Sequence, residues 1–146
     1  MNRENEDLSN QPTGRLLVNA FRCFEKELLL RLQGKKITDI TLSHLNVIRH
    51  LNPEGMKLIE LARDAALTKQ AISKICSNLS KKGYISIISN DIDARAKSVA
   101  FTKKGARLIE VAIEITREME AEYIEQLGEK PYKQLRSSLN KLTQGE

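Results

Sequence analysis

Apolar residues recur three and four positions apart along most of this chain, which is the spacing of helices that bury one face. Thr41 and Thr68 each precede such a stretch and suit the N-cap position, and Gly83 is the expected stop of the fourth stretch. For the first half of the chain, the pattern predicts helices over residues 14–34, 41–51, 58–65 and 68–82.

The pattern changes after Gly83. Residues 84–88 are rich in β-branched and aromatic side chains, and residues 98–101 alternate, with Val99 and Phe101 on one side. The polar segment SNDIDARAK lies between these two stretches. We therefore expect a small two-stranded β wing with an extended tip.

Helical spacing returns after the wing. Thr102 starts a helix whose apolar stripe runs from Leu108 to Leu127, and Gly128 ends it. A last helix places the apolar residues of 132–142 together, whereas residues 1–13 are polar and are expected to form a frayed arm.

The order of these elements predicts a mainly α fold, a winged helix-turn-helix, within a single domain of residues 1–146. Its DNA-binding region would be 41–105. The helices at 14–34 and 106–144 carry more apolar surface than so small a core can cover, because the stripe within 108–127 alone is about 30 Å long. We expect these helices to form a homodimer; the alternative is that they pack on each other within one subunit.

Composition narrows the class of protein. The chain has 146 residues, a formal charge of +5 and a pI near 9.3, which favours a polyanionic partner. The N-terminus lacks the apolar core of a signal peptide, and no apolar run approaches a membrane span. Two cysteines are too few for a disulfide framework, so a cytoplasmic protein without membrane contact is expected.

The helix at 68–82 carries the functional pattern. Ile72, Ile75 and Leu79 form its predicted buried face, and the segment contains no Asp or Glu, whereas an ordinary solvated face mixes both signs of charge. Amide, hydroxyl and ammonium groups without carboxylates suit double-stranded DNA. The opposite face, with Lys69 at its edge, consists of Gln70, Ser73, Lys74, Ser77 and Lys81.

Roles within this helix follow from position. Gln70, Ser73 and Lys74 are expected to face base edges, while Thr68 and Lys69 at the helix N-terminus would anchor phosphates. In the wing, Arg95 would enter a narrow A·T-rich minor groove with Asp93 aligning its guanidinium, and Lys97 would contact a phosphate. The alternative for the wing tip is a charged hairpin that only maintains solubility.

The same residues carry a family resemblance. The segments ITLSHLNVIRHL, EGMKLIELARDAALTKQAISKICSNLSKKGYIS and NDIDARAKSVAFTKKG resemble the MarR family of bacterial and archaeal regulators. The resemblance covers about residues 14–142 in element order and is specific over 55–105. One departure is Ile92, where the family often has Pro. The family's D-x-R wing and V-x-[LF]-T-x-x-G helix start are matched by Asp93, Arg95, Val99, Phe101, Thr102 and Gly105.

The resemblance implies an obligate dimer with intertwined terminal helices, recognition helices in successive major grooves and wings in the minor groove. The operator would be pseudo-palindromic. Many such proteins are repressors that small anionic ligands or thiol oxidation release. The expected function is therefore that of a transcriptional regulator. The resemblance implies a repressor with a small-molecule effector, which the sequence does not identify.

Other chemistry finds little support in the sequence. His44 and His50 are six positions apart and do not share a helix face, and no catalytic triad, phosphate loop or metal-binding spacing is present. We expect no enzyme activity, cofactor or metal. Cys23 and Cys76 are expected to be buried structural residues, with redox sensing as the alternative. The competing functions are a winged-helix protein–protein adaptor and a ligand sensor without direct operator binding.

Overall fold

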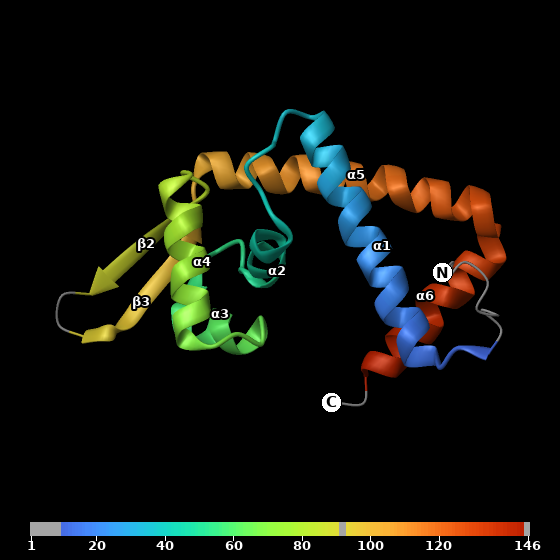
Figure 1. Ribbon diagram of the computed structural model, residues 1–146, viewed down its shortest axis with the longest axis horizontal. Helices are drawn as coiled ribbons and strands as arrows, with labels where there is room; N and C mark the ends of the chain where they lie inside the picture. Colours follow the sequence, from blue (N-terminus) through green and yellow to red (C-terminus); the bar gives the residue numbers. More distant parts are fainter. Residues whose placement is uncertain (1–9, 91–92, 145–146) are drawn as a thin grey trace, which may run out of the picture. The chain divides into compact units, whose positions relative to one another are not determined.

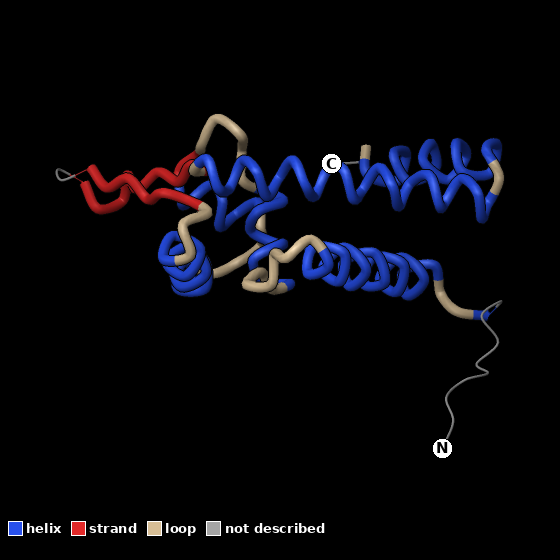
Figure 2. Tube along the Cα trace, turned by 90° about the horizontal axis from the view of Figure 1, so that it is seen from above, coloured by secondary structure: helices blue, strands red, loops and turns tan. Residues whose placement is uncertain are grey.

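A computed structural model describes residues 10–90 and 93–144; for Asn90 and residues 93–95 it describes the backbone only (Figure 1). The chain divides into two compact units, Met1–Leu108 and Ile109–Glu146. Most of the polar arm expected at residues 1–13 lies outside the described residues. Each unit is built mainly from helices, and the strands all belong to the first (Figure 2).

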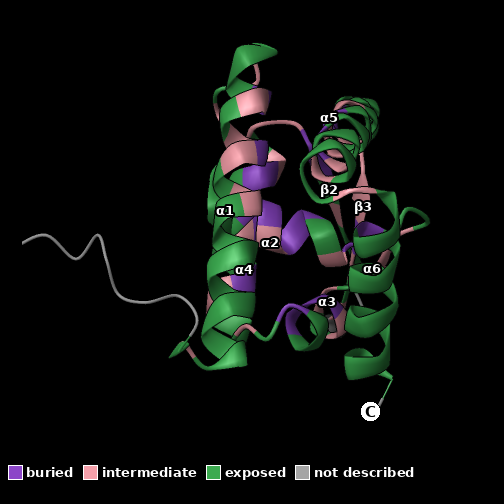
Figure 3. Ribbon diagram, turned by 90° about the vertical axis from the view of Figure 1, so that its right-hand side faces the viewer, coloured by how far each residue is buried: buried purple, intermediate pink, exposed green. Residues whose placement is uncertain are grey.

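The first two helices are α1, Thr13–Gly34, and α2, Leu42–His50, as the apolar spacing predicts. Thr41 caps α2 as expected, because its hydroxyl accepts a hydrogen bond from the backbone N–H of His44 at 3.3 Å. Most of α1 remains exposed, with its buried residues near its C-terminal end (Figure 3). The buried side chains of these two helices include Leu28, Leu32, Leu45, Val47 and Ile48.

The helix-turn-helix consists of α3, Leu58–Asp64, and α4, Lys69–Lys81, which contact each other and α2. Ala66 adopts a φ of 54° in the turn between them. The predicted buried face of α4 needs one correction, because Ile75 is only half-buried and Cys76 is fully buried. Ile72 and Leu79 are buried as expected.

The wing belongs to a three-stranded antiparallel sheet with the order β1-β3-β2, one strand more than the sequence pattern predicts. Its strands are β1, Met56–Lys57, β2, Ile85–Asn90, and β3, Asp93–Phe101. The hairpin strands are longer than expected because pairing continues through the polar segment to Asn90 and Asp93. The extra strand, β1, has only two residues and pairs Met56 with Val99, so no alternating pattern could mark it.

The hairpin leads directly into α5, Lys103–Leu127. Thr102 caps this helix, since its hydroxyl accepts from the Gly105 N–H at 3.1 Å and donates to the Gly83 carbonyl at 2.5 Å. A Cβ on Gly105 would lie 2.0 Å from the Tyr84 carbonyl oxygen. The close approach of helix and strand at this point therefore requires glycine.

The second unit contains most of α5 together with α6, Glu129–Thr143. Gly128 joins the two helices with a φ of 89°, a conformation that favours glycine. Within this unit α6 turns back along α5, and Arg136 of α6 donates a hydrogen bond from Nη1 to Oε1 of Glu120 at 3.2 Å. Apolar side chains that remain exposed here are Ile113, Ile124, Leu127, Leu135, Leu139 and Leu142.

Candidate nucleic-acid interface

The N-terminus of α4 is open to solvent at the surface of the first unit. Thr68 caps it through a 3.1 Å hydrogen bond from the Ala71 N–H to its hydroxyl oxygen. That bond uses the hydroxyl as an acceptor and leaves its O–H available to donate. Thr68, Lys69 and Gln70 are all exposed, so donor groups and one cation gather where the helix dipole favours an anion.

The outward face of α4 is polar and basic, as the sequence predicts. Every member of that face is exposed, whereas Ile72, Cys76 and Leu79 on the opposite side are buried. Among the described residues, no ion pair neutralises the ammonium groups of this face. The exposed residues are Gln70, Ser73, Lys74, Ser77 and Lys81.

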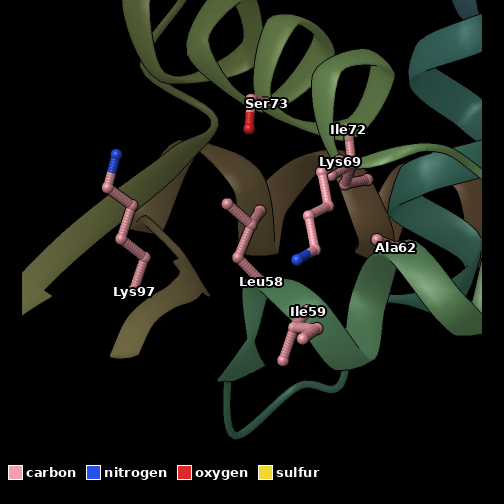
Figure 4. Close-up of a pocket in the computed structure, with 7 residues that line it drawn as sticks. All are labelled: Leu58, Ile59, Ala62, Lys69, Ile72, Ser73 and Lys97. Carbon is pink, nitrogen blue, oxygen red and sulfur yellow. The ribbon is translucent and has the colours of Figure 1, made fainter. Parts of the chain in front are cut away.

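The structure brings part of the wing next to this helix. A groove of about 260 Å³ lies between α3, α4 and β3, and Lys69, Ser73 and Lys97 supply its polar lining. Figure 4 shows Ser73 and Lys69 extending from α4 on one side of the groove and Lys97 on the other, with Leu58 between them. Three residues that are predicted from the sequence to contact DNA therefore line one groove.

The structure describes the predicted wing tip only in part. The backbones of Asp93 and Arg95 belong to β3, but their side chains lie outside the described residues. The predicted alignment of Arg95 by Asp93 therefore remains a prediction. Lys97, two residues further along the strand, has an exposed side chain.

A buried polar contact that the sequence does not reveal joins α4 to α2. His44 is 6% exposed, and its Nε2 lies 2.8 Å from Oδ1 of Asn78 on α4. Burial lowers the pKa of His44 below its ordinary value, and the hydrogen bond to Asn78 opposes that effect. His44 is thus a packing residue. Its position three residues after the Thr41 N-cap is that of a capping box, which indicates the bond from the Thr41 N–H but not the contact with Asn78.

The two cysteines differ from each other. Cys76 is fully buried, as expected, and burial raises the pKa of its thiol to about 11, so little reactive thiolate forms at neutral pH. Cys23 is exposed on α1, which corrects the expectation that both are buried. Within the described part of the chain, no cluster of His, Cys, Asp and Glu could hold a metal ion. No helix in that part is long and apolar enough to span a bilayer.

Comparisons with known proteins identify the fold. Neither protein-family models nor curated protein sequences give a match to this chain. Solved structures do match: apo MarR from E. coli is 21% identical, with a TM-score of 0.74 over 91% of this chain and 97% of that one. MepR from S. aureus in complex with DNA is 21% identical, with a TM-score of 0.70 over 94% and 100%.

A third solved structure, from Bordetella bronchiseptica, is BpsR, whose DNA binding is regulated by 6-hydroxynicotinic acid. It is 16% identical, with a TM-score of 0.70 over 91% of this chain and 99% of that one. The similar structures are MarR-family regulators. The winged helix fold expected from the sequence resemblance is therefore confirmed.

Proposed function

We propose that this chain, which has the fold of MarR-family regulators, is a dimeric, sequence-specific DNA-binding transcriptional regulator without enzyme activity. The observation that carries the proposal is the outward face of α4. It is exposed, polar and basic, it contains no carboxylate, and Thr68 caps its start. A helix of this kind beside a β wing suits the major groove of a duplex.

The proposed contacts divide into two classes. Gln70, Ser73 and Lys74 read base edges, because they project from the exposed face of α4 in its N-terminal half. Ser77 is a further DNA contact on the same face. Thr68 and Lys69 hold a phosphate at the start of the helix. The wing adds Lys97 to a phosphate and Arg95, aligned by Asp93, to the minor groove.

The proposed dimer rests on exposed apolar surface outside the DNA-binding region of 41–105. In α1, Phe21 is 45% exposed and lies in an apolar stretch that a soluble monomer would leave in water. A second copy covering the helices at 14–34 and 106–144 would bury such side chains. In α1 the exposed apolar residues are Leu16, Leu17, Val18, Phe21 and Leu30.

Repression released by a small molecule is the proposed mode of regulation. The groove between α3, α4 and β3 is small, apolar at Leu58 and Ile59, and cationic at Lys69 and Lys97, which suits a small aromatic acid. Because Lys69, Ser73 and Lys97 are also proposed DNA contacts, a ligand bound there would compete with DNA. This effector class matches the one named for BpsR.

Selection of duplexes from a random pool by the full-length protein tests the proposal. We expect an inverted repeat whose half-sites lie about one helical turn apart, with affinity that falls steeply as salt rises. A protein–protein adaptor would recover no common sequence and would show no such salt dependence. Sedimentation of the same preparation should report a dimer.

A further inference from the structure

We propose that Asn78 donates a hydrogen bond to a DNA backbone phosphate and that buried His44 holds its side-chain amide in the necessary orientation. The inference rests on the proposed DNA-binding function. It adds a phosphate contact beside α2, whereas the phosphate contacts proposed above lie at the start of α4 and at the wing. Neither residue is suggested by the exposed pattern of α4 in the sequence.

The orientation follows from hydrogen bonding around the imidazole of His44. The backbone N–H of Thr41, which can only donate, lies 3.0 Å from Nδ1 of His44. Nδ1 must therefore be the unprotonated nitrogen, and the neutral ring carries its proton on Nε2. That N–H points at Asn78 across 2.8 Å and requires an acceptor, which is Oδ1.

These hydrogen bonds determine which polar group of the Asn78 side chain is available to a ligand. Its carbonyl oxygen is used by His44, so the NH₂ group is directed away from the ring with both N–H donors available. Among the described residues, no acceptor forms a hydrogen bond with the side-chain nitrogen of Asn78, and Asn78 is exposed. Bidentate reading of adenine requires the oxygen as well as the nitrogen of an Asn side chain. Asn78 is therefore suited to an acceptor such as a phosphate oxygen and not to a base edge.

The surroundings favour an anion. Asn78 lines a surface hollow between α2 and α4 together with Ser43, Lys74, Ser77 and Lys81, and no carboxylate lines it. Lys74 and Lys81 lie about one helical turn before and after Asn78, on the same side of α4. The amide donors thus lie between two ammonium groups, whose positive charge favours a phosphate oxygen at this place.

Asn78 variants of the full-length protein test the contact by fluorescence anisotropy on two duplexes, one selected from a random pool and one of scrambled sequence. Asn78→Ala should weaken binding to both by roughly tenfold, because a hydrogen bond to a charged group is lost. Asn78→Asp should weaken both further, since it still accepts from His44 but presents a carboxylate to the phosphate. Asn10→Asp, the same change at an exposed position outside the proposed DNA-binding and dimerisation regions, should leave binding unchanged.

The outcomes separate the contact from the function. If the wild-type protein binds DNA and the Asn78 variants bind equally well, the proposed contact is wrong but the proposed function stands. The contact is also wrong if an Asn78 variant changes the sequence preference, because that result would indicate that Asn78 reads a base. Failure of the wild-type protein to bind either duplex overturns the proposed function itself. Thermal unfolding of each variant confirms that the fold is retained.

The positioning role of His44 is tested with His44→Gln, because glutamine at this position still caps α2 but lacks the Nε2–H that reaches Asn78. It should weaken DNA binding about fivefold in the wild-type background and hardly at all in the Asn78→Ala background. Equal losses in both backgrounds would show a general structural effect of His44 and would contradict its role through Asn78.

Discussion

The phenol of Tyr84 donates a 2.6 Å hydrogen bond to the carboxylate of Asp39, a residue 45 positions earlier in the chain. This bond joins the segment before α2 to the point where α4 leads into the wing. The ammonium of Lys104 lies 4.4 Å from the centre of the Tyr84 ring. The three side chains thus connect the helix-turn-helix to the start of α5.

Tyr84→Phe should reduce the free energy of unfolding at neutral pH by about 1–3 kcal/mol, since the Asp39 carboxylate loses its donor. Burial and Asp39 raise the pKa of Tyr84 to about 12 from 10.0. Between these values the unfolded chain has released a proton that the folded chain retains, so stability falls as pH rises. Urea unfolding from neutral pH to about pH 12 should show this loss in the wild type. If the Tyr84→Phe variant lost as much stability at alkaline pH as the wild type, the loss would come from other titratable groups.

Gln70→Ala should relax sequence preference at one position in each half-site and cost about 1–3 kcal/mol of binding free energy on the selected duplex. The reason is that Gln70 is exposed near the start of α4, where side chains of a recognition helix meet base edges. Repeating the duplex selection with the variant measures the effect. An affinity loss of the same size on every sequence would instead assign Gln70 to the DNA backbone.

Arg95→Ala should weaken binding strongly and reduce any preference for A·T-rich flanks, because a guanidinium is attracted by the negative potential of a narrow minor groove. Asp93→Asn should also weaken binding, although it removes a negative charge near DNA. A purely electrostatic role of Asp93 predicts the opposite sign. Both variants are compared on one duplex at fixed salt, with Lys97→Ala as a variant that should mainly lower the salt dependence. Tighter binding by the Asp93 variant would exclude the aligning role.

Leu17→Glu should shift the protein from dimer toward monomer, because this α1 side chain is 42% exposed in the single chain and would be buried between copies. The matched control is Ile88→Glu in the wing, which makes the same kind of change at a side chain that is 61% exposed. Sedimentation velocity without DNA should report a dimer for the control. An unchanged dimer in the Leu17 variant would move the proposed interface away from this part of α1.

The sequence by itself determined the helices and the exposed, polar and basic side of α4. These features depend on local chemistry: Thr68 caps the first turn, and the 3.6-residue period separates Ile72 and Leu79 from Gln70 and Ser73. The same locality explains why α2 begins where Thr41 predicts. The start of α5 after Thr102 follows for the same reason.

Only the tertiary structure decided which distant residues meet. The strand β1 exists because Met56 pairs with Val99, and two residues are too few to show a periodicity. A helical face is broad, so the choice between Ile75 and Cys76 as the buried residue depended on how α4 packs against its neighbours. His44 meets Asn78 across 34 positions, and such a contact leaves no periodic signal because it is set by the packing of α2 on α4.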